Sequence, residues 1–196
     1  MLWANAKNQT KANNSGKDKV SFTFNHALAK IGYSVKSNAD YDQTTITVKS
    51  IKLVGSVDGK ANAFYTKGTI DLSKADNKAN DLWTTASDDT KQNFTLLSSN
   101  LTLSTTKHEP KDYLFVIPQD FSSTNNLYVV VEYTVKTTDN TDNIEITNTV
   151  SQKITKDFKQ GKAYMINLII GLTPIEFKAT VNQWTNGESI GDIELN

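Results

Sequence analysis

Cysteine and arginine are both absent from this 196-residue chain. The lack of cysteine excludes a disulfide framework, thiol catalysis and zinc sites that use cysteine ligands. All 21 basic residues are lysines. The 21 acidic residues balance them, so the net charge is +0. Proteins that bind nucleic acid usually carry a basic excess and use arginine for bidentate phosphate contacts. The charge pattern therefore argues against nucleic-acid binding.

Long hydrophobic runs are missing as well. A transmembrane helix needs roughly 18 or more consecutive apolar residues, and the chain contains no such run. The first residues, MLWANAKNQTKANNSGK, contain neither the apolar centre of a signal peptide nor a cysteine for lipidation. We therefore expect no transmembrane segment in this chain and, if the protein is exported, an export signal that lies outside it.

Polar residues of the turn-forming kind take the place of apolar ones. Hydrophobic residues make up 37% of the chain, against about 45–50% in typical globular domains. Charged residues are only 21%, so threonine, serine, asparagine and aspartate fill the difference. These side chains hydrogen-bond to nearby backbone and favour turns over helix interiors, while β-branched threonine suits strands. The composition thus favours a β protein.

The first strand pattern begins at Val20. Val20, Phe22 and Phe24 alternate with polar residues, which predicts a half-buried strand. Residues 27–31 fit either one helical turn or a strand with a bulge. Leu2 and Trp3 precede a polar segment and are candidates either to dock on the domain or to belong to a preceding one.

A second strand is predicted at Ile46–Val54. Its apolar side chains change parity near Lys49, and a β-bulge there would return them to one buried face. Asp58-Gly59 is a hairpin turn signal before residues 61–65. Residues 73–93 are predicted to form a long polar excursion with one helical turn.

The second half of the chain has the clearest strand patterns. They lie at residues 113–117, 127–135, 144–154, 163–170 and 175–181. Turn signals separate these short segments, and no helix of several turns alternates with them, which favours an all-β sandwich over a parallel α/β sheet. Ile144, Ile146, Val150 and Ile154 share one parity and are predicted to face the core.

Residues able to carry catalysis are few. The two histidines, His26 and His108, lack the spacing of a metal or triad motif. His26 is predicted to be a structural imidazole bonded to backbone, and His108 to lie in a solvated loop. Asp139–Asn143 resembles a calcium loop but lacks the central glycine and the terminal glutamate. We expect no catalytic residue, no cofactor and no bound metal.

Tryptophan offers one candidate ligand site. Trp83 lies alone in the polar excursion and, with Tyr65, forms a candidate platform for stacking sugar rings. Aromatic residues more often pack into a core or a lid, so both interpretations stay open. Trp184 follows a strong strand and is predicted to close the core.

Three blocks of residues carry a resemblance to a known family. They are Val20–Ile31 (VSFTFNHALAKI, with His26, Ala27 and Leu28), Phe115–Gln119 (FVIPQ, with Pro118 and Gln119) and Gly161–Trp184. In this order they resemble the C-terminal domain of the fimbrillin family of Bacteroides-type bacteria, over about residues 2–184. The chain is similar to roughly the second half of a complete subunit.

The resemblance implies a fold and a division of the chain. The implied fold is an all-β, transthyretin-like antiparallel β-sandwich with Greek-key-like connections. Residues 1–19 would be the remnant of an interdomain linker, residues 20–184 the sandwich domain, and residues 185–196 a C-terminal tail.

The resemblance also implies a structural subunit of a bacterial surface fimbria, either a pilin or a pilus-associated adhesion protein. Its expected location is extracellular, on the fimbrium or outer-membrane surface after lipoprotein export. Its expected partners are other fimbrial subunits, joined by β-strand exchange, and a host glycan or protein receptor. Ile190, Ile193 and Leu195 make the tail a candidate donor strand, with a disordered tail as the alternative. A surface carbohydrate-binding module is the alternative function, and stalk, tip and anchor roles stay open.

Overall fold

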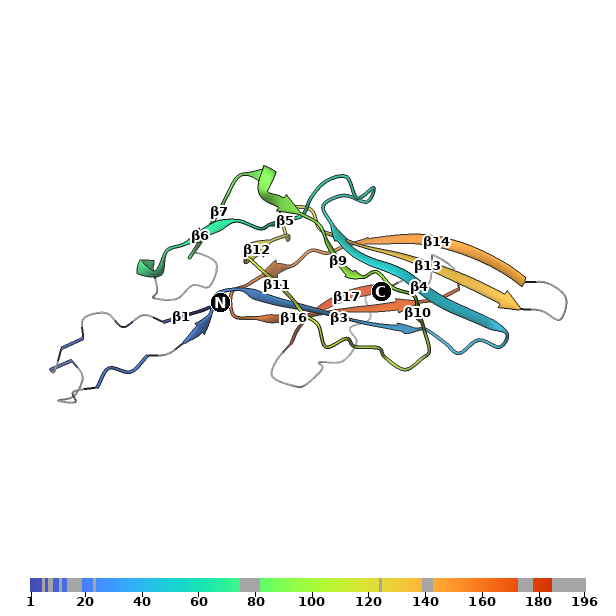
Figure 1. Cartoon of the computed structure of the whole chain (residues 1–196), viewed down its shortest axis with the longest axis horizontal. Coiled ribbons are helices and arrows are strands. Elements are labelled where there is room, and N and C mark those ends of the chain that lie inside the picture. The colour runs from blue at the N-terminus through green and yellow to red at the C-terminus, as the bar shows by residue number, and fades with distance from the viewer. Residues whose placement is uncertain are drawn as a thin grey trace.

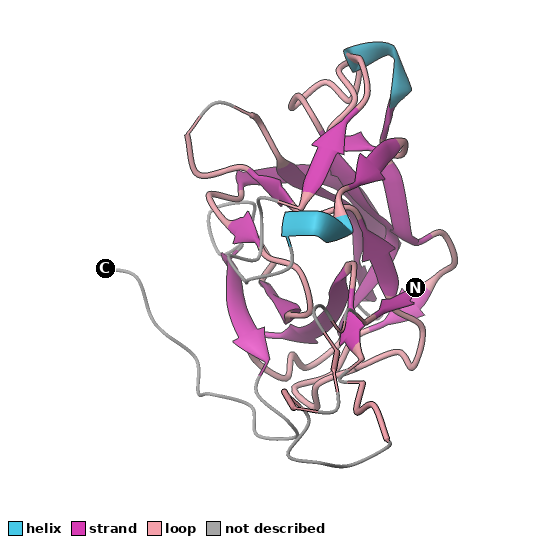
Figure 2. Ribbon diagram, turned by 90° about the vertical axis from the view of Figure 1, so that its left-hand side faces the viewer, coloured by secondary structure: helices cyan, strands magenta, loops and turns pink. Residues whose placement is uncertain are grey.

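A computed structural model describes most of the chain. The described residues are 1–4, 6, 9–10, 12–13, 19–22, 24–74, 82–123, 125–138, 143–172 and 178–184. Within them the ordered elements are strands, apart from the short 3₁₀ turns η1 (Leu72–Lys74) and η2 (Asp88–Thr90). The long strands run along the long axis of the molecule (Figure 1), and Figure 2 shows the strands from the end that carries β6 and β7.

Two sheets form the main layers. The first sheet has the order β10 (Leu101–Thr102), β4 (Thr44–Val54), β13 (Tyr128–Thr138) and β14 (Asn143–Lys153), and β9 (Phe94–Leu97) also pairs with β4. The second sheet has the order β11 (Leu114–Val116), β3 (Ala29–Ser37), β16 (Ala163–Ile170) and β17 (Lys178–Trp184). The chain passes repeatedly from one sheet to the other, as it must in a sandwich.

Short strand pairs complete the described fold. They are β1 (Leu2–Trp3) with β2 (Asn25–His26), β5 (Phe64–Tyr65) with β8 (Lys91–Gln92), β6 (Gly68–Ile70) with β7 (Trp83–Thr85), and β12 (Gln119–Asp120) with β15 (Asp157–Phe158). Every pairing is antiparallel except that of β3 with β16, which is parallel. The predicted all-β sandwich is confirmed, with this parallel pair as its departure from a wholly antiparallel arrangement.

The core lies between the two sheets and follows the period-two rule. Along β16, buried residues alternate with half-buried ones, so Tyr164, Ile166, Leu168 and Ile170 point into the interior. The β13 strand contributes its own alternate residues to the same cluster. A row of aromatic rings fills one end of this core: Phe64, Phe121, Phe158 and Tyr164, with centroids 5.1, 5.9 and 4.8 Å apart in that order.

The bulge predicted near Lys49-Ser50 is confirmed. Opposite it on β13, Glu132 pairs with Ser50 while the next residue, Tyr133, pairs with Val48. Lys49 is therefore the extra residue of the ladder. The apolar residues on both sides of it (Ile46, Val48, Ile51 and Leu53) are all buried, as the change of parity required.

The turn at Asp58-Gly59 is present, but it does not close a hairpin. Gly59 has a φ of 71° and its N–H donates to the Ser56 carbonyl at 2.9 Å. The following strand, β5, pairs with β8 rather than with β4. The excursion after β6 contains the two short 3₁₀ turns as well as β7 and β8.

The strand predicted from Val20 is wrong for residues 20–24 and right from Ala29 onward, where β3 is buried. Val20, Phe22 and Phe24 are 44%, 56% and 66% exposed, and the first long strand begins only at Ala29. The segment that contains them lies in the arm that extends away from the two sheets (Figure 1), so neither sheet covers it. The helical alternative for residues 27–31 is also wrong, since this segment leads straight into β3.

The prediction for β14 is half right. Ile144, Ile146, Val150 and Ile154 share one face, but only Val150 and Ile154 are buried, at 7% and 4% exposure. Ile144 and Ile146 are 59% and 55% exposed. The described part of β17 begins at Lys178, near Gln152 of β14, so it covers the end of β14 and not its start.

Candidate interaction surface

The described residues contain no group of three or more His, Cys, Asp or Glu side chains placed to hold a metal ion. His26 is exposed on β2, so its side chain lies outside the core, and its role as a structural imidazole stays a prediction. His108 is exposed too, and only its backbone is engaged, in a pair of hydrogen bonds with Val35. No helix in the described part of the chain is long and apolar enough to cross a membrane.

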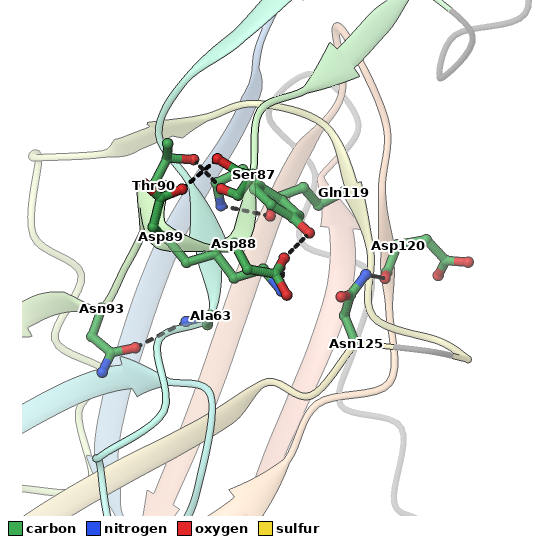
Figure 3. A network of polar contacts seen from close by, with 11 residues as sticks. Ala63, Ser87, Asp88, Asp89, Thr90, Asn93, Gln119, Asp120 and Asn125 are labelled. Atoms are coloured by element: carbon green, nitrogen blue, oxygen red, sulfur yellow. Dashed lines mark hydrogen bonds and ion pairs between the residues drawn. The ribbon is translucent and has the colours of Figure 1, made fainter.

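Tyr65 belongs to a polar cluster at one end of the sandwich. Its hydroxyl donates to Asp88, which is labelled in Figure 3, and Lys91 forms an ion pair with the same carboxylate at 3.1 Å. The Lys91 ammonium lies 4.5 Å from the centroid of the Tyr65 ring, on one of its faces. The hydrogen bond from Tyr65 lowers the pKa of Asp88, and Lys91 lowers it further.

Removing the Tyr65 hydroxyl should raise the pKa of Asp88. Because its pKa is lowered by folding, the ionised Asp88 stabilises the folded state at pH values above the usual aspartate pKa. This stabilisation is lost as the pH falls through the folded-state pKa of Asp88. In Tyr65→Phe the pKa of Asp88 should move up toward its ordinary value, as NMR titration of the carboxyl carbon will show. Asp120, whose pKa is lowered chiefly by Ser122, is the internal control and should not shift. An unchanged Asp88 titration contradicts this assignment.

Trp83 lies in a different small sheet and packs against the start of the chain. Its indole N–H donates to the Ala27 carbonyl at 2.8 Å, and its ring contacts the small cluster of Trp3, Ala27 and Leu82. Trp3 is only 8% exposed, so the start of the chain docks on the domain. Tyr65 and Trp83 are therefore held by separate contacts, and their role as a sugar platform stays a prediction.

Two sheet edges meet on the side of the sandwich formed by β14 and β17. The Gln152 side chain on β14 donates to the Ala179 carbonyl at 3.0 Å and accepts from the Ala179 N–H at 2.9 Å. It thereby occupies one rung of the β17 edge as a neighbouring strand would. Beside this contact a groove of about 230 Å³ runs between residues 152–156 and residues 179–182. The sequence patterns did not reveal this contact, because it joins positions that only the fold brings together.

Comparison with known families decides the relationship of the chain. The sequence profile of the fimbrillin-like family matches residues 1–184. The chain belongs to the fimbrillin-like family. No curated protein matches this fimbrillin-like chain in sequence.

Solved structures share the fold of this fimbrillin-like chain. A fimbrial protein from Bacteroides vulgatus is 23% identical with a TM-score of 0.67, and the match covers 90% of this chain and 59% of that one. A protein from Bacteroides ovatus assigned to cell adhesion is 15% identical with a TM-score of 0.42, covering 86% of this chain and 49% of that one. The fimbrillin-like chain thus spans about half to three-fifths of the length of these proteins, and the first of them supports the fold.

The first resemblance block joins three parts of the fimbrillin-like domain. Ala27 is fully buried, and its N–H donates to the Met1 carbonyl at 3.1 Å while its carbonyl accepts from Trp83. The Leu28 carbonyl accepts from the N–H of Gly161 at 3.1 Å. Ala27 thereby links the start of the chain to β7, and Leu28 links it to the turn before β16.

The second block ends in a buried amide. Gln119, directly after Pro118, is 6% exposed; its Oε1 accepts from the Tyr65 N–H at 2.8 Å and its Nε2 donates to the Ile117 carbonyl at 2.9 Å. It therefore ties β5 to the start of β12 (Figure 3). Neighbouring amides act alike, since Asn93 accepts from the Ala63 N–H at 3.1 Å. This role was not predicted from the sequence.

The remaining predicted residues lie at or beyond the end of the described chain. The backbone of Trp184 pairs with Ala163 at the end of β17, while its side chain lies outside the described part, so its role as a core plug stays a prediction. Ile190, Ile193 and Leu195 of the tail also lie outside the described residues.

Proposed function

We propose that this chain is a structural part of a bacterial surface fimbria, located at the cell surface and joined to other fimbrial subunits. The observation that carries the proposal is the fimbrillin-like match over residues 1–184. The fold shared with a fimbrial protein from Bacteroides vulgatus supports it. A stalk, tip or anchor role and the identity of a host receptor stay predictions.

Subunits would associate by adding a strand to the open edge of β17. The N–H and the carbonyl of Ala179 both bond to the Gln152 side chain, which shows that they point away from β16. Residues two apart in a strand point the same way, so the backbone groups of Val181 and Gln183 also face outward. No backbone partner for these groups lies within the described residues. Such an edge is a template for another strand.

The tail of a neighbouring subunit is the proposed donor. Residues 185–196 contain alternating Ile193 and Leu195 together with three acidic residues (Glu188, Asp192 and Glu194) and no lysine. Lys153 and Lys156 line the groove beside the β17 edge, and none of its lining residues is acidic. Opposite charges across a contact favour encounter and pairing.

A peptide of residues 185–196 should bind a chain that lacks its own tail. Calorimetry should detect saturable binding that weakens as salt rises, because the contact pairs exposed charges. Lys156→Glu should reduce the affinity about tenfold by reversing one groove charge. The matched control is Lys60→Glu, in the turn before β5, which should bind as the parent does.

The peptide itself supplies a second control. Replacing Ile193 and Leu195 by aspartate should abolish binding, while a scrambled peptide of the same composition separates strand pairing from simple charge attraction. If the tailless chain binds neither the native peptide nor a tail-bearing chain at millimolar concentration, the strand-addition part of the proposal is wrong.

A further inference from the structure

The β14 strand is a long and regular sheet edge. It pairs with β13 over Asn143–Lys153 without a register shift and ends the strand order of the first sheet. It contains no proline and no bulge, the features that usually protect an edge from pairing with another chain. Neither of these two features therefore prevents another strand from pairing with the edge of β14.

The backbone groups that β14 turns outward can be assigned from one hydrogen bond. The Ile154 N–H donates to the Leu127 carbonyl at 2.8 Å, so at position 154 the backbone faces β13. Because direction alternates along a strand, positions 145, 147, 149, 151 and 153 face away from β13. Their backbone groups have no hydrogen-bond partner within the described residues.

The charges of β14 are self-complementary. Glu145 and Lys153 are its only charged residues, and they lie at equal distances on either side of Thr149. In an antiparallel pair of two β14 strands centred on Thr149, each Glu145 faces Lys153 of the other copy. The neighbouring two-fold registers, centred on Asn148 or Val150, place neither charge opposite the other. Opposite charges in directly facing positions stabilise a strand pair.

The same register places an exposed apolar side chain opposite an apolar neighbour. Ile144 and Ile146, at 59% and 55% exposure, lie on the same face as Ile154, the residue after β14, which is 4% exposed. Centred on Thr149, each exposed Ile144 lies opposite Ile154 of the second copy, and the two-fold axis repeats the contact. The arrangement thus gives Ile144 an apolar neighbour that the described part of β17 does not supply.

We propose that two copies of this chain associate by antiparallel pairing of their β14 edges, in the register centred on Thr149. The first sheets of the two copies then form one continuous sheet. This contact goes beyond strand addition by the tail, and uses different backbone groups, because β17 belongs to the second sheet.

Charge reversal tests the pairing. The wild-type chain should show a concentration-dependent monomer–dimer equilibrium by sedimentation analysis. Glu145→Lys alone, or Lys153→Glu alone, should raise the dimer dissociation constant at least tenfold, since each puts like charges opposite one another twice. The double variant Glu145→Lys/Lys153→Glu should restore dimerisation. Glu109→Lys, an exposed change outside the two main sheets, is the matched control and should dimerise normally.

Cross-linking tests the register, and the lack of native cysteine makes the test clean. Thr149→Cys should form a disulfide-linked dimer on mild oxidation, because position 149 faces itself at a Cα separation within disulfide range. Thr147→Cys should not, because the two copies of position 147 lie about 13 Å apart along the strands. Cross-linking of position 147 in place of position 149 overturns the register.

Removing residues 185–196 separates this proposal from strand addition by the tail. The tailless chain should still dimerise and still cross-link at position 149. If dimerisation is lost with the tail, or if the wild-type chain stays monomeric at several hundred micromolar, the β14 pairing is wrong. Thermal unfolding of each variant at low concentration identifies any loss of the dimer that is caused by a destabilised monomer. Glu145→Lys needs this check in particular, because position 145 lies opposite Lys136 on β13.

Discussion

Replacing Phe121 by alanine is expected to lower the free energy of unfolding by about 3–5 kcal/mol. The ring is 1% exposed and lies between Phe64 and Phe158, with edge-to-face geometry toward both. Truncation removes these contacts and leaves a cavity that neighbouring rings in regular strands can fill only in part. Chemical denaturation followed by tryptophan fluorescence measures the change.

Phe115, which lies outside the aromatic row, provides the control for this prediction. It lies on β11 and is 55% exposed, so Phe115→Ala removes an aromatic ring of the same size from the surface. Its effect should stay within about 0.5 kcal/mol. A loss for Phe121→Ala no larger than the loss for Phe115→Ala would show that the aromatic row does not support the end of the core.

Replacing Gln119 by alanine should lower the free energy of unfolding by about 2–3 kcal/mol. The change removes two hydrogen bonds and leaves the N–H of Tyr65 without its side-chain acceptor in a region shielded from solvent. An unsatisfied buried donor costs more than the bond itself contributes. Denaturation experiments measure the loss, and hydrogen exchange at the Tyr65 amide should become faster.

An exposed glutamine close by serves as the control. Gln92 lies on β8, which pairs with the same β5 strand, and its side chain is exposed. Gln92→Ala should change the free energy of unfolding by no more than about 0.5 kcal/mol. If hydrogen exchange at Tyr65 is equally slow in Gln119→Ala and in the parent, the proposed role of the buried amide is contradicted.

Local sequence patterns were sufficient to predict strands that have a partner strand on each side. The bulge near Lys49 was predicted because the apolar positions change parity within one run. One extra residue in the strand is what keeps the side chains on both sides of that change on the same buried face. The central strands β4 and β13 followed the same logic. Their alternation is set by the backbone itself, and both lie within the first sheet with partners on each side.

The same patterns were misleading at the margins of the fold. Val20, Phe22 and Phe24 alternate as regularly as the residues of β13, yet they are exposed. Alternation states which side chains share a face and does not state whether anything lies against that face. Ile144 and Ile146 show the same limit on β14, where the first half of the strand extends past the described part of β17.

The amide contacts lay beyond prediction for a different reason. Gln152 meets Ala179 and Gln119 meets Tyr65 across long stretches of sequence, and an isolated glutamine in a strand carries no signal of the backbone that it will bond. The sugar platform depended on the same kind of information. The sequence left open whether Tyr65 and Trp83 form a platform or pack, and in the structure Asp88, Lys91 and Ala27 contact them.

From the sequence alone come the strand content, the bulge, the absence of thiol chemistry and, through three blocks of residues, the family of the chain. All of these depend on residues close together in sequence or on their order along it. The tertiary structure alone decided the parallel pairing of β3 with β16, the cover over each apolar face, and which strands form the edges. Those features depend on where distant segments meet, because a strand is an edge only when no other strand pairs with its outer side.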